Sequence, residues 1–243
     1  MNIIETLKDD TEYYSGVGKN YLSNSDIGTL LNNPQDFGKP REDNKNFVDG
    51  RYFHQLILEP DKAAVVPFVD VSTRTTKEYK NYCEENNLQY VMLKKEQDEL
   101  RRLVSVMNSN ITFFEQIYKT GNQFEVPAVA EIQGMMWKGK TDVLGDDFLI
   151  DVKTTSDIHK FKWTAKSYNY DSQCYIYQQL FGKPLVFFVA DKLTSQLGIF
   201  RPTDDFIKSG EAKVARAIEV YNKYFSPASS DDIANYFIEE SLY

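Results

Sequence analysis

The first half of the chain repeats apolar residues at a spacing of three or four, which is typical of amphipathic helices. In the segment 23–33, Ile27, Leu30 and Leu31 fall on one helical face, cap candidates stand at the start, and Pro34 follows the end. The same spacing predicts further helices over residues 46–59, 76–87 and 94–110. The N-terminal part of the protein is therefore expected to be helical.

From Pro127 the pattern changes to that of strands. Three strands are expected over 128–137, 138–145 and 148–155, with turns at Trp137–Gly139 and Gly145–Asp147. A helix closed by Gly182, a strand covered on both faces, a further strand and a long helix are expected over 165–182, 184–191, 195–202 and 204–225. This order predicts an α/β fold with a mixed sheet flanked by helices, in one domain spanning 1–243. Its parts are a helical segment 1–126, a sheet-containing core 127–200 and a C-terminal helical segment 201–243.

Composition places the protein among ordinary globular chains, with 42% hydrophobic and 26% charged residues. No apolar run is long enough to span a bilayer and no signal peptide is recognisable, so a cytoplasmic location without membrane contact is expected. The two cysteines are too few for a metal cluster and are expected to be packing residues. A net charge of −8 argues against non-specific nucleic-acid binding. A local basic groove is still allowed by lysines at 138, 140, 153, 160, 162 and 166.

Asp142, Asp151 and Lys153 are charged residues inside two of the predicted strands. Asp151 and Lys153 share one face of a strand, about 6.5 Å apart. A two-residue turn at Asp146–Asp147 would place Asp142 directly across from Asp151, with Cβ atoms about 5 Å apart, whereas an odd-length turn would separate them. Two such carboxylates repel unless a cation lies between them, and Mg²⁺ or Mn²⁺ suits an oxygen-rich site. The alternative is a cross-strand ion pair of Asp142 with Lys153 on a solvated face.

The arrangement around these charges resembles a known superfamily. Gln173 and Tyr177 are four residues apart on the following helix, as are Gly50 and His54 upstream. Together with Asp142 and the Asp-x-Lys triplet, this pattern resembles the PD-(D/E)XK nucleases, in particular the RecE-type (exonuclease VIII) branch, related to RecB nuclease domains and lambda exonuclease. The stretches that are similar to that branch, between Tyr21 and Leu180, are "YLSNSDIGTLLNNPQDF", "GRYFHQLILEPD", "STRTTKEYKNY", "DVKTTSD" and "YNYDSQCYIY".

The resemblance implies a catalytic role for each residue of the strand motif. Asp142 and Asp151 would bind the metal, with the backbone carbonyl of Val152 completing its inner shell. Lys153 would orient the attacking water or offset charge on the phosphate. Two Mg²⁺ or Mn²⁺ ions per site are expected.

Four further residues are assigned by position in the same pattern, each beside a structural alternative. His54 would contribute a metal ligand, or else be a core or surface residue. Glu131, on the first strand, would add an acidic catalytic group, or else be solvated. Gln173 and Tyr177 would bind DNA or brace the catalytic lysine, or else pack the helix on the sheet.

By this resemblance the protein is expected to be a metal-dependent exonuclease acting on the ends of linear double-stranded DNA. The family precedent is 5′→3′ digestion that leaves 3′ overhangs for a single-strand annealing protein, carried out by a toroidal trimer or tetramer encoded by a phage or prophage. The alternatives are a structure-specific or restriction-type endonuclease and a catalytically idle DNA-end-binding scaffold.

Overall fold

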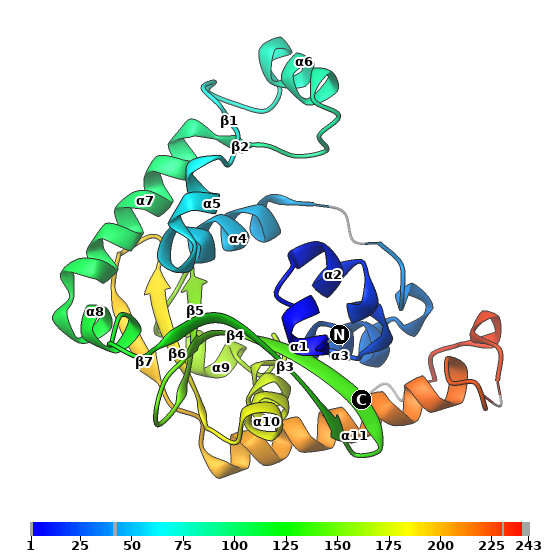
Figure 1. Ribbon diagram of the computed structural model, residues 1–243. Helices are drawn as coiled ribbons and strands as arrows, with labels where there is room; N and C mark the ends of the chain where they lie inside the picture. The colour runs from blue at the N-terminus through cyan, green and yellow to red at the C-terminus, as the bar shows by residue number, and fades with distance from the viewer. Residues whose placement is uncertain (1, 41–42, 230, 240–243) are drawn as a thin grey trace.

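A five-stranded mixed sheet forms the centre of the computed structural model, which describes residues 2–40, 43–229 and 231–239 (Figure 1). The strand order is β3-β4-β5-β6-β7, in which only the β5–β6 pair is parallel. The strands are β3 (Gln123–Ile132), β4 (Met135–Leu144), β5 (Leu149–Thr155), β6 (Leu185–Asp191) and β7 (Leu197–Phe200). The expected fold class, a mixed sheet flanked by helices, is thus confirmed.

Helices cover both faces of this sheet. One face packs against α3 (Asn24–Asn32), α10 (Tyr170–Phe181) and α11 (Asp204–Tyr224). The other packs against α4 (Lys45–Leu58), α7 (Lys94–Ser109) and α8 (Ile111–Ile117). Because side chains alternate along a strand, the fully buried β6 supplies Phe187 to the first core and Phe188 to the second.

The shorter elements lie around this sandwich. They are α1 (Ile3–Thr6), α2 (Asp10–Tyr14), η1 (Val17–Asn20), η2 (Pro34–Asp36), α5 (Pro60–Ala64), β1 (Phe68–Val69), α6 (Lys77–Glu85), β2 (Met92–Leu93), α9 (Phe161–Thr164) and η3 (Ile233–Asn235). The parallel pair β1–β2 and α6 form an arm that projects from the body and has its own small core around Tyr79 (Figure 1). Among the described residues, no helix combines the length and apolarity needed to cross a bilayer.

Most of the predicted elements are present, and their sequence signals are visible in the structure. Asp26 completes a capping box with Ser23 at the start of α3. Gly182 ends α10 in the left-handed conformation, with φ 66°. Cys174 is buried in a core, as expected of a packing residue.

The predicted turn at Trp137–Gly139 is wrong. The β3–β4 hairpin turns at Gln133–Gly134 instead, where φ values of 51° and 79° give the left-handed backbone that a tight two-residue hairpin requires. Trp137 is fully buried within β4. This shift of the turn changes which residues of β3 face β4 and therefore which acid reaches the site.

The predicted turn between β4 and β5 is confirmed. Leu144 pairs with Leu149, and the Gly145 N–H donates to the Phe148 carbonyl at 3.2 Å. The turn therefore lies on Asp146–Asp147 and has the even length that keeps facing residues on one side of the sheet.

Candidate active site

The site lies where β4 and β5 separate. Their ladder pairs end at Val143 with Ile150, so the next residues across from each other are Asp142 and Asp151. Beyond that point the Asp142 Oδ2 atom accepts the Val152 N–H at 2.7 Å, in place of a backbone partner. The Asp142 carboxylate thus sits between two diverging strands and is buried.

The same geometry bears on the predicted role of the Val152 carbonyl. The N–H and C=O of one strand residue point to the same side, so this carbonyl faces the gap next to Asp142. Its position is compatible with the predicted metal contact, which stays a prediction.

Glu125 brings a further carboxylate from β3. It lies between the pairs Phe124 with Val143 and Val126 with Thr141, which places it across the hairpin from Asp142. Its φ of 51° is left-handed, which is uncommon for a residue with a side chain and is found at functional sites. Sequence reasoning missed Glu125, and the Gln-Gly pair at the hairpin turn was the signal that could have found it.

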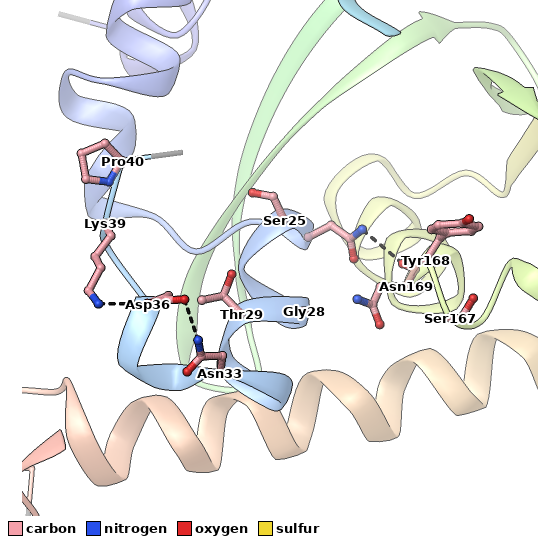
Figure 2. Close-up of a pocket in the computed structure, with 11 residues that line it drawn as sticks. Ser25, Gly28, Thr29, Asn33, Asp36, Lys39, Pro40, Ser167, Tyr168 and Asn169 are labelled. Carbon is pink, nitrogen blue, oxygen red and sulfur yellow. Dashed lines mark hydrogen bonds and ion pairs between the residues drawn. The ribbon is translucent and has the colours of Figure 1, made fainter. Parts of the chain in front are cut away.

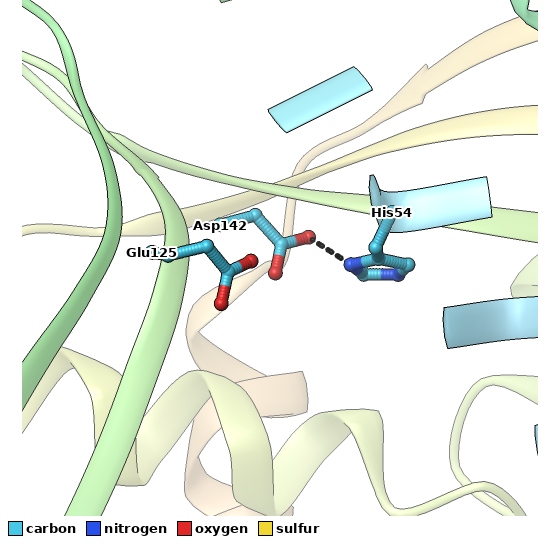
Figure 3. A group of neighbouring side chains, drawn as sticks. All are labelled: His54, Glu125 and Asp142. Atoms are coloured by element: carbon cyan, nitrogen blue, oxygen red, sulfur yellow. Dashed lines mark ion pairs between the residues drawn. The ribbon is translucent and has the colours of Figure 1, made fainter. Parts of the chain in front are cut away.

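His54 reaches the site from α4. Asn44 caps this helix by accepting N–H groups of its first turn, and Phe53 anchors it in the core with no exposed surface. The His54 Nδ1 atom lies 3.3 Å from Asp142 Oδ2 (Figure 3). One ligand atom from each of His54, Glu125 and Asp142 can be chosen so that all lie within 4.8 Å of one another.

Asp151 and Lys153 form the other half of the site, on β5. The Lys153 Nζ atom is 2.5 Å from Asp151 Oδ2. Gln173 lies in the first turn of α10, and its Nε2 atom donates a hydrogen bond to Asp151 Oδ1 at 2.5 Å. The alternative of a cross-strand ion pair between Lys153 and Asp142 is not seen, since Lys153 pairs with Asp151 on its own strand.

Gln173 and Tyr177 are both buried and are used inside the protein. Gln173 fixes the carboxylate of Asp151, and the Tyr177 hydroxyl donates to the Lys140 carbonyl at 2.9 Å. Close packing of α10 on β4 depends on Gly139, since a Cβ there would lie 2.6 Å from the Leu180 side chain. These contacts orient the Asp151 carboxylate and pack α10 on β4, and the predicted contacts with DNA or the catalytic lysine stay predictions.

Glu131 does not reach the site. It pairs with Met136 beside the Gln133–Gly134 turn and is exposed. The expectation that it is the additional acid is corrected by the hairpin register, which gives that place to Glu125, six residues earlier on the same strand.

The electrostatics of the cluster are those of crowded carboxylates. Burial and the charge of Asp142 raise the pKa of Glu125 to about 8. Burial also raises the pKa of Asp151, although Lys153 opposes this. For Asp142 burial acts in the same direction, but His54 and Lys153 outweigh it and lower the pKa. Three carboxyl groups therefore converge beside Lys153 and His54.

This donor set fits a divalent metal ion. The Asp151 Oδ2 atom is buried and accepts no hydrogen bond from the described part of the chain, although Lys153 is in ion contact with it. Carboxylates suit Mg²⁺ and Mn²⁺, and an imidazole ligand favours transition metals, so the set fits Mn²⁺ at least as well as Mg²⁺. His54, Glu125, Asp142 and Asp151 are the side chains that would hold such an ion.

Comparison with known proteins identifies the family. The model of the family described as "PDDEXK-like domain of unknown function (DUF3799)" matches residues 29–234. No curated protein matches the sequence.

Among the solved structures that match the chain are two exonuclease-related proteins. The structure of a protein of Eubacterium rectale provisionally assigned as an exonuclease has 19% identity and a TM-score of 0.64, covering 97% of this chain and 96% of that one. A phage-related exonuclease from Haemophilus somnus 129PT has 15% identity and a TM-score of 0.33, covering 61% of this chain and 82% of that one. The family match spans most of the sequence, and the chain belongs to the PDDEXK-like family, a domain of the PD-(D/E)XK nuclease type.

Proposed function

We propose that the protein is a metal-dependent exodeoxyribonuclease that hydrolyses linear double-stranded DNA, in the 5′→3′ direction, and leaves 3′ single-stranded overhangs for recombination by strand annealing. The observation that carries the proposal is the convergence of Glu125, Asp142, Asp151 and Lys153 with His54, from four different elements, at the splayed end of β4 and β5.

Each side chain has a role that its contacts support. When bound, Mg²⁺ or Mn²⁺, in one or two ions, would activate a water molecule and stabilise the departing 3′-oxygen. Lys153 holds a positive charge beside Asp151, where it can orient the water or offset charge developing on the phosphate. Gln173 keeps the Asp151 carboxylate in one orientation through the bond to Oδ1.

The test is digestion of linear and covalently closed circular duplex DNA, with each strand end labelled in turn, in Mg²⁺, Mn²⁺ or EDTA. The proposal expects metal-dependent loss of linear DNA alone, starting from 5′ ends. Cutting of the circle would identify an endonuclease, and digestion from 3′ ends would overturn the polarity. An Asp151→Asn variant that is folded and inactive assigns the cleavage to this site. Absence of cutting in every metal would leave a DNA-end-binding scaffold.

The proposal includes a toroidal trimer or tetramer that encircles the DNA and an annealing protein as partner. Processive digestion of one strand requires that the enzyme stay on its substrate, and a closed ring provides this. Light scattering during size-exclusion chromatography gives the mass of the assembly in multiples of the 28.2 kDa chain. A monomer at micromolar concentration would contradict this part of the proposal.

A further inference from the structure

The segment between β5 and α10 exposes aromatic and basic side chains that the proposed chemistry does not use. Trp163 is 67% exposed and Tyr168 is 64% exposed. Lys162 and Lys166 are exposed beside them, and the Lys162 Nζ atom lies 4.1 Å from the centre of the Trp163 ring. We call these four residues the Trp163–Tyr168 surface. Large aromatic rings left in water next to cations indicate a binding surface rather than a folding requirement.

The lysines of this surface are available for a ligand. Lys160 is paired with Asp157 at 2.9 Å. Within the described residues, Lys162 and Lys166 have no such carboxylate partner, and their contacts are with the aromatic rings of Trp163 and Phe206. Their positive charge is concentrated on a chain whose net charge is −8. These two lysines therefore favour an anionic ligand at this place.

A row of rings connects this surface with the active site. The Lys153 Nζ atom lies 5.2 Å from the centre of the Tyr170 ring. The Tyr170 ring lies 5.8 Å from that of Tyr168, with an angle of 31° between their planes. The path thus runs from the lysine of the nuclease motif through a partly buried tyrosine to an exposed one.

A polar groove continues from Tyr168 on the other side. It has a volume of about 740 Å³ and lies between α3 and residues 167–169 (Figure 2). Its walls include Asn24, Ser25 and Thr29 from α3, opposite Tyr168 and Asn169. The groove has the size of a small-ligand site and is lined mainly by polar side chains, among which Lys39 and Asp36 form an ion pair.

We propose that the Trp163–Tyr168 surface binds single-stranded DNA by base stacking and guides that strand along Tyr168 and Tyr170 to Lys153. Stacking on exposed rings requires unpaired bases, because the bases of a duplex already stack on each other. Lysines between the rings contact the phosphates that join these bases. The binding of the strand stands on this surface alone, whereas its delivery to Lys153 rests on the proposed nuclease function.

The fluorescence of Trp163 can report directly on ligand binding at this surface. Trp137 is fully buried and Trp163 is 67% exposed, so a ligand that stacks on the surface quenches the emission of Trp163 selectively. Titration with an oligothymidylate of about 12 nucleotides, in EDTA to prevent hydrolysis, is expected to give saturable quenching. A duplex of the same length is expected to compete poorly.

Variants assign the binding to individual side chains. In anisotropy titrations with a labelled oligothymidylate, Trp163→Ala and Tyr168→Ala are each expected to raise Kd at least about fivefold. The control is Phe114→Ala, which removes a ring that is 48% exposed on α8, on the opposite face of the sheet, and should leave Kd unchanged. The double variant Lys162→Gln/Lys166→Gln should reduce the slope of log K against log salt by about 1.4.

Two results would overturn the binding. One is equal Kd values for wild type, Trp163→Ala and Tyr168→Ala, and the other is equal quenching of Trp163 by the duplex and by the single strand. In Mn²⁺, guidance to the site predicts that Tyr168→Ala raises KM for DNA with kcat within about twofold, in proportion to the lost stacking. An unchanged KM would overturn the guidance. Quenching of Trp163 without any cleavage of DNA would reject the proposed nuclease function but would leave the Trp163–Tyr168 surface as a binding site for single-stranded DNA.

Discussion

Glu125 and Glu131 lie on the same strand, but only Glu125 faces Asp142. We expect Glu125→Gln to lower kcat for duplex digestion in Mn²⁺ by about tenfold or more, because it removes a group that would bind the metal. The matched variant Glu131→Gln changes an exposed acid beside the hairpin turn and should stay within about twofold of wild type. Equal losses in the two variants would contradict the hairpin register as the basis of the site.

Lys153 is the side chain whose removal separates chemistry from binding. We expect Lys153→Gln to lower the single-turnover cleavage rate by about 10²–10³-fold, since a positive charge beside the reacting phosphate is lost. Glutamine retains an N–H donor for Asp151, so folding, followed by near-ultraviolet circular dichroism, should be preserved. Metal-free binding of DNA should stay close to that of wild type. A variant that cleaves at the normal rate would remove this lysine from the mechanism.

The sequence indicates most of the site because its charged residues stand where burial normally excludes charge. Asp142, Asp151 and Lys153 interrupt apolar strands, and the even turn between β4 and β5 fixes their common face. His54 stands in a motif whose resemblance to known nucleases predicts its role, and the structure places it beside Asp142. Glu125 carries no such local signal, since its position depends on the Gln133–Gly134 turn, which begins eight residues later.

At the scale of elements, the N-terminal segment 2–20 has a role that its sequence pattern does not indicate. Its helices are too short to show periodicity, yet it covers two lysines of β4. The Asp10 carboxylate joins Lys140 and Lys62, each at 2.7 Å. Lys138 and Lys140 also lie against the Tyr13 ring, with Nζ atoms 4.4 and 4.6 Å from its centre. Asp10 thus links the N-terminal segment to both β4 and α5 through two ion pairs.

The variant Asp10→Asn tests the contribution of these two ion pairs. Burial opposes ionisation of Asp10, but Lys140 and Lys62 outweigh it and lower its pKa. The contribution is therefore present above the ordinary pKa and is lost as the pH falls through the lowered value. At neutral pH we expect trypsin to cleave at Lys8 and Lys19 about two- to tenfold faster in the variant, because local opening becomes easier.

A neighbouring aspartate supplies the control for this experiment. Asp9 caps α2 by accepting the Glu12 N–H, and asparagine caps a helix equally well. Asp9→Asn should therefore be cleaved at the wild-type rate, although it removes the same charge from the same segment. Equal acceleration in both variants would show that net charge, and not the bridge to Lys62 and Lys140, determines the opening.

For the whole molecule, the sequence predicts the layers and the helix at residues 76–87, but not the arm that this helix forms with β1 and β2. Helical and strand periods are local, and they give a sheet with helices on both faces. The arm of β1, α6 and β2 is held by contacts between residues far apart in sequence, in which Glu96 binds both Lys45 and Arg74. Such long-range pairs have no periodic signature, so the arm is visible only in the folded chain.

The site also affects the stability of the whole protein. Burial and the charge of Asp142 raise the pKa of Glu125, and burial raises the pKa of Asp151, so ionisation of these two groups opposes folding until a metal ion lies beside them. A ligand at 100 times its Kd stabilises the folded state by about 2.7 kcal/mol. For a chain of 243 residues this corresponds to a rise in Tm of about 5–10 °C. We therefore expect saturating Mn²⁺ to raise Tm by this amount relative to EDTA, as followed by calorimetry.

Variants connect this shift with the cluster. Glu125→Gln relieves part of the repulsion, so its Tm in EDTA should equal or exceed that of wild type, while its rise in Mn²⁺ should be smaller. Glu131→Gln, which lies outside the cluster, should show the full rise. If Mn²⁺ raised the Tm of Glu125→Gln and of wild type equally, the stabilising ion would lie elsewhere. The metal would then stabilise the fold without a contact to Glu125, the acid that the β3–β4 hairpin places beside Asp142.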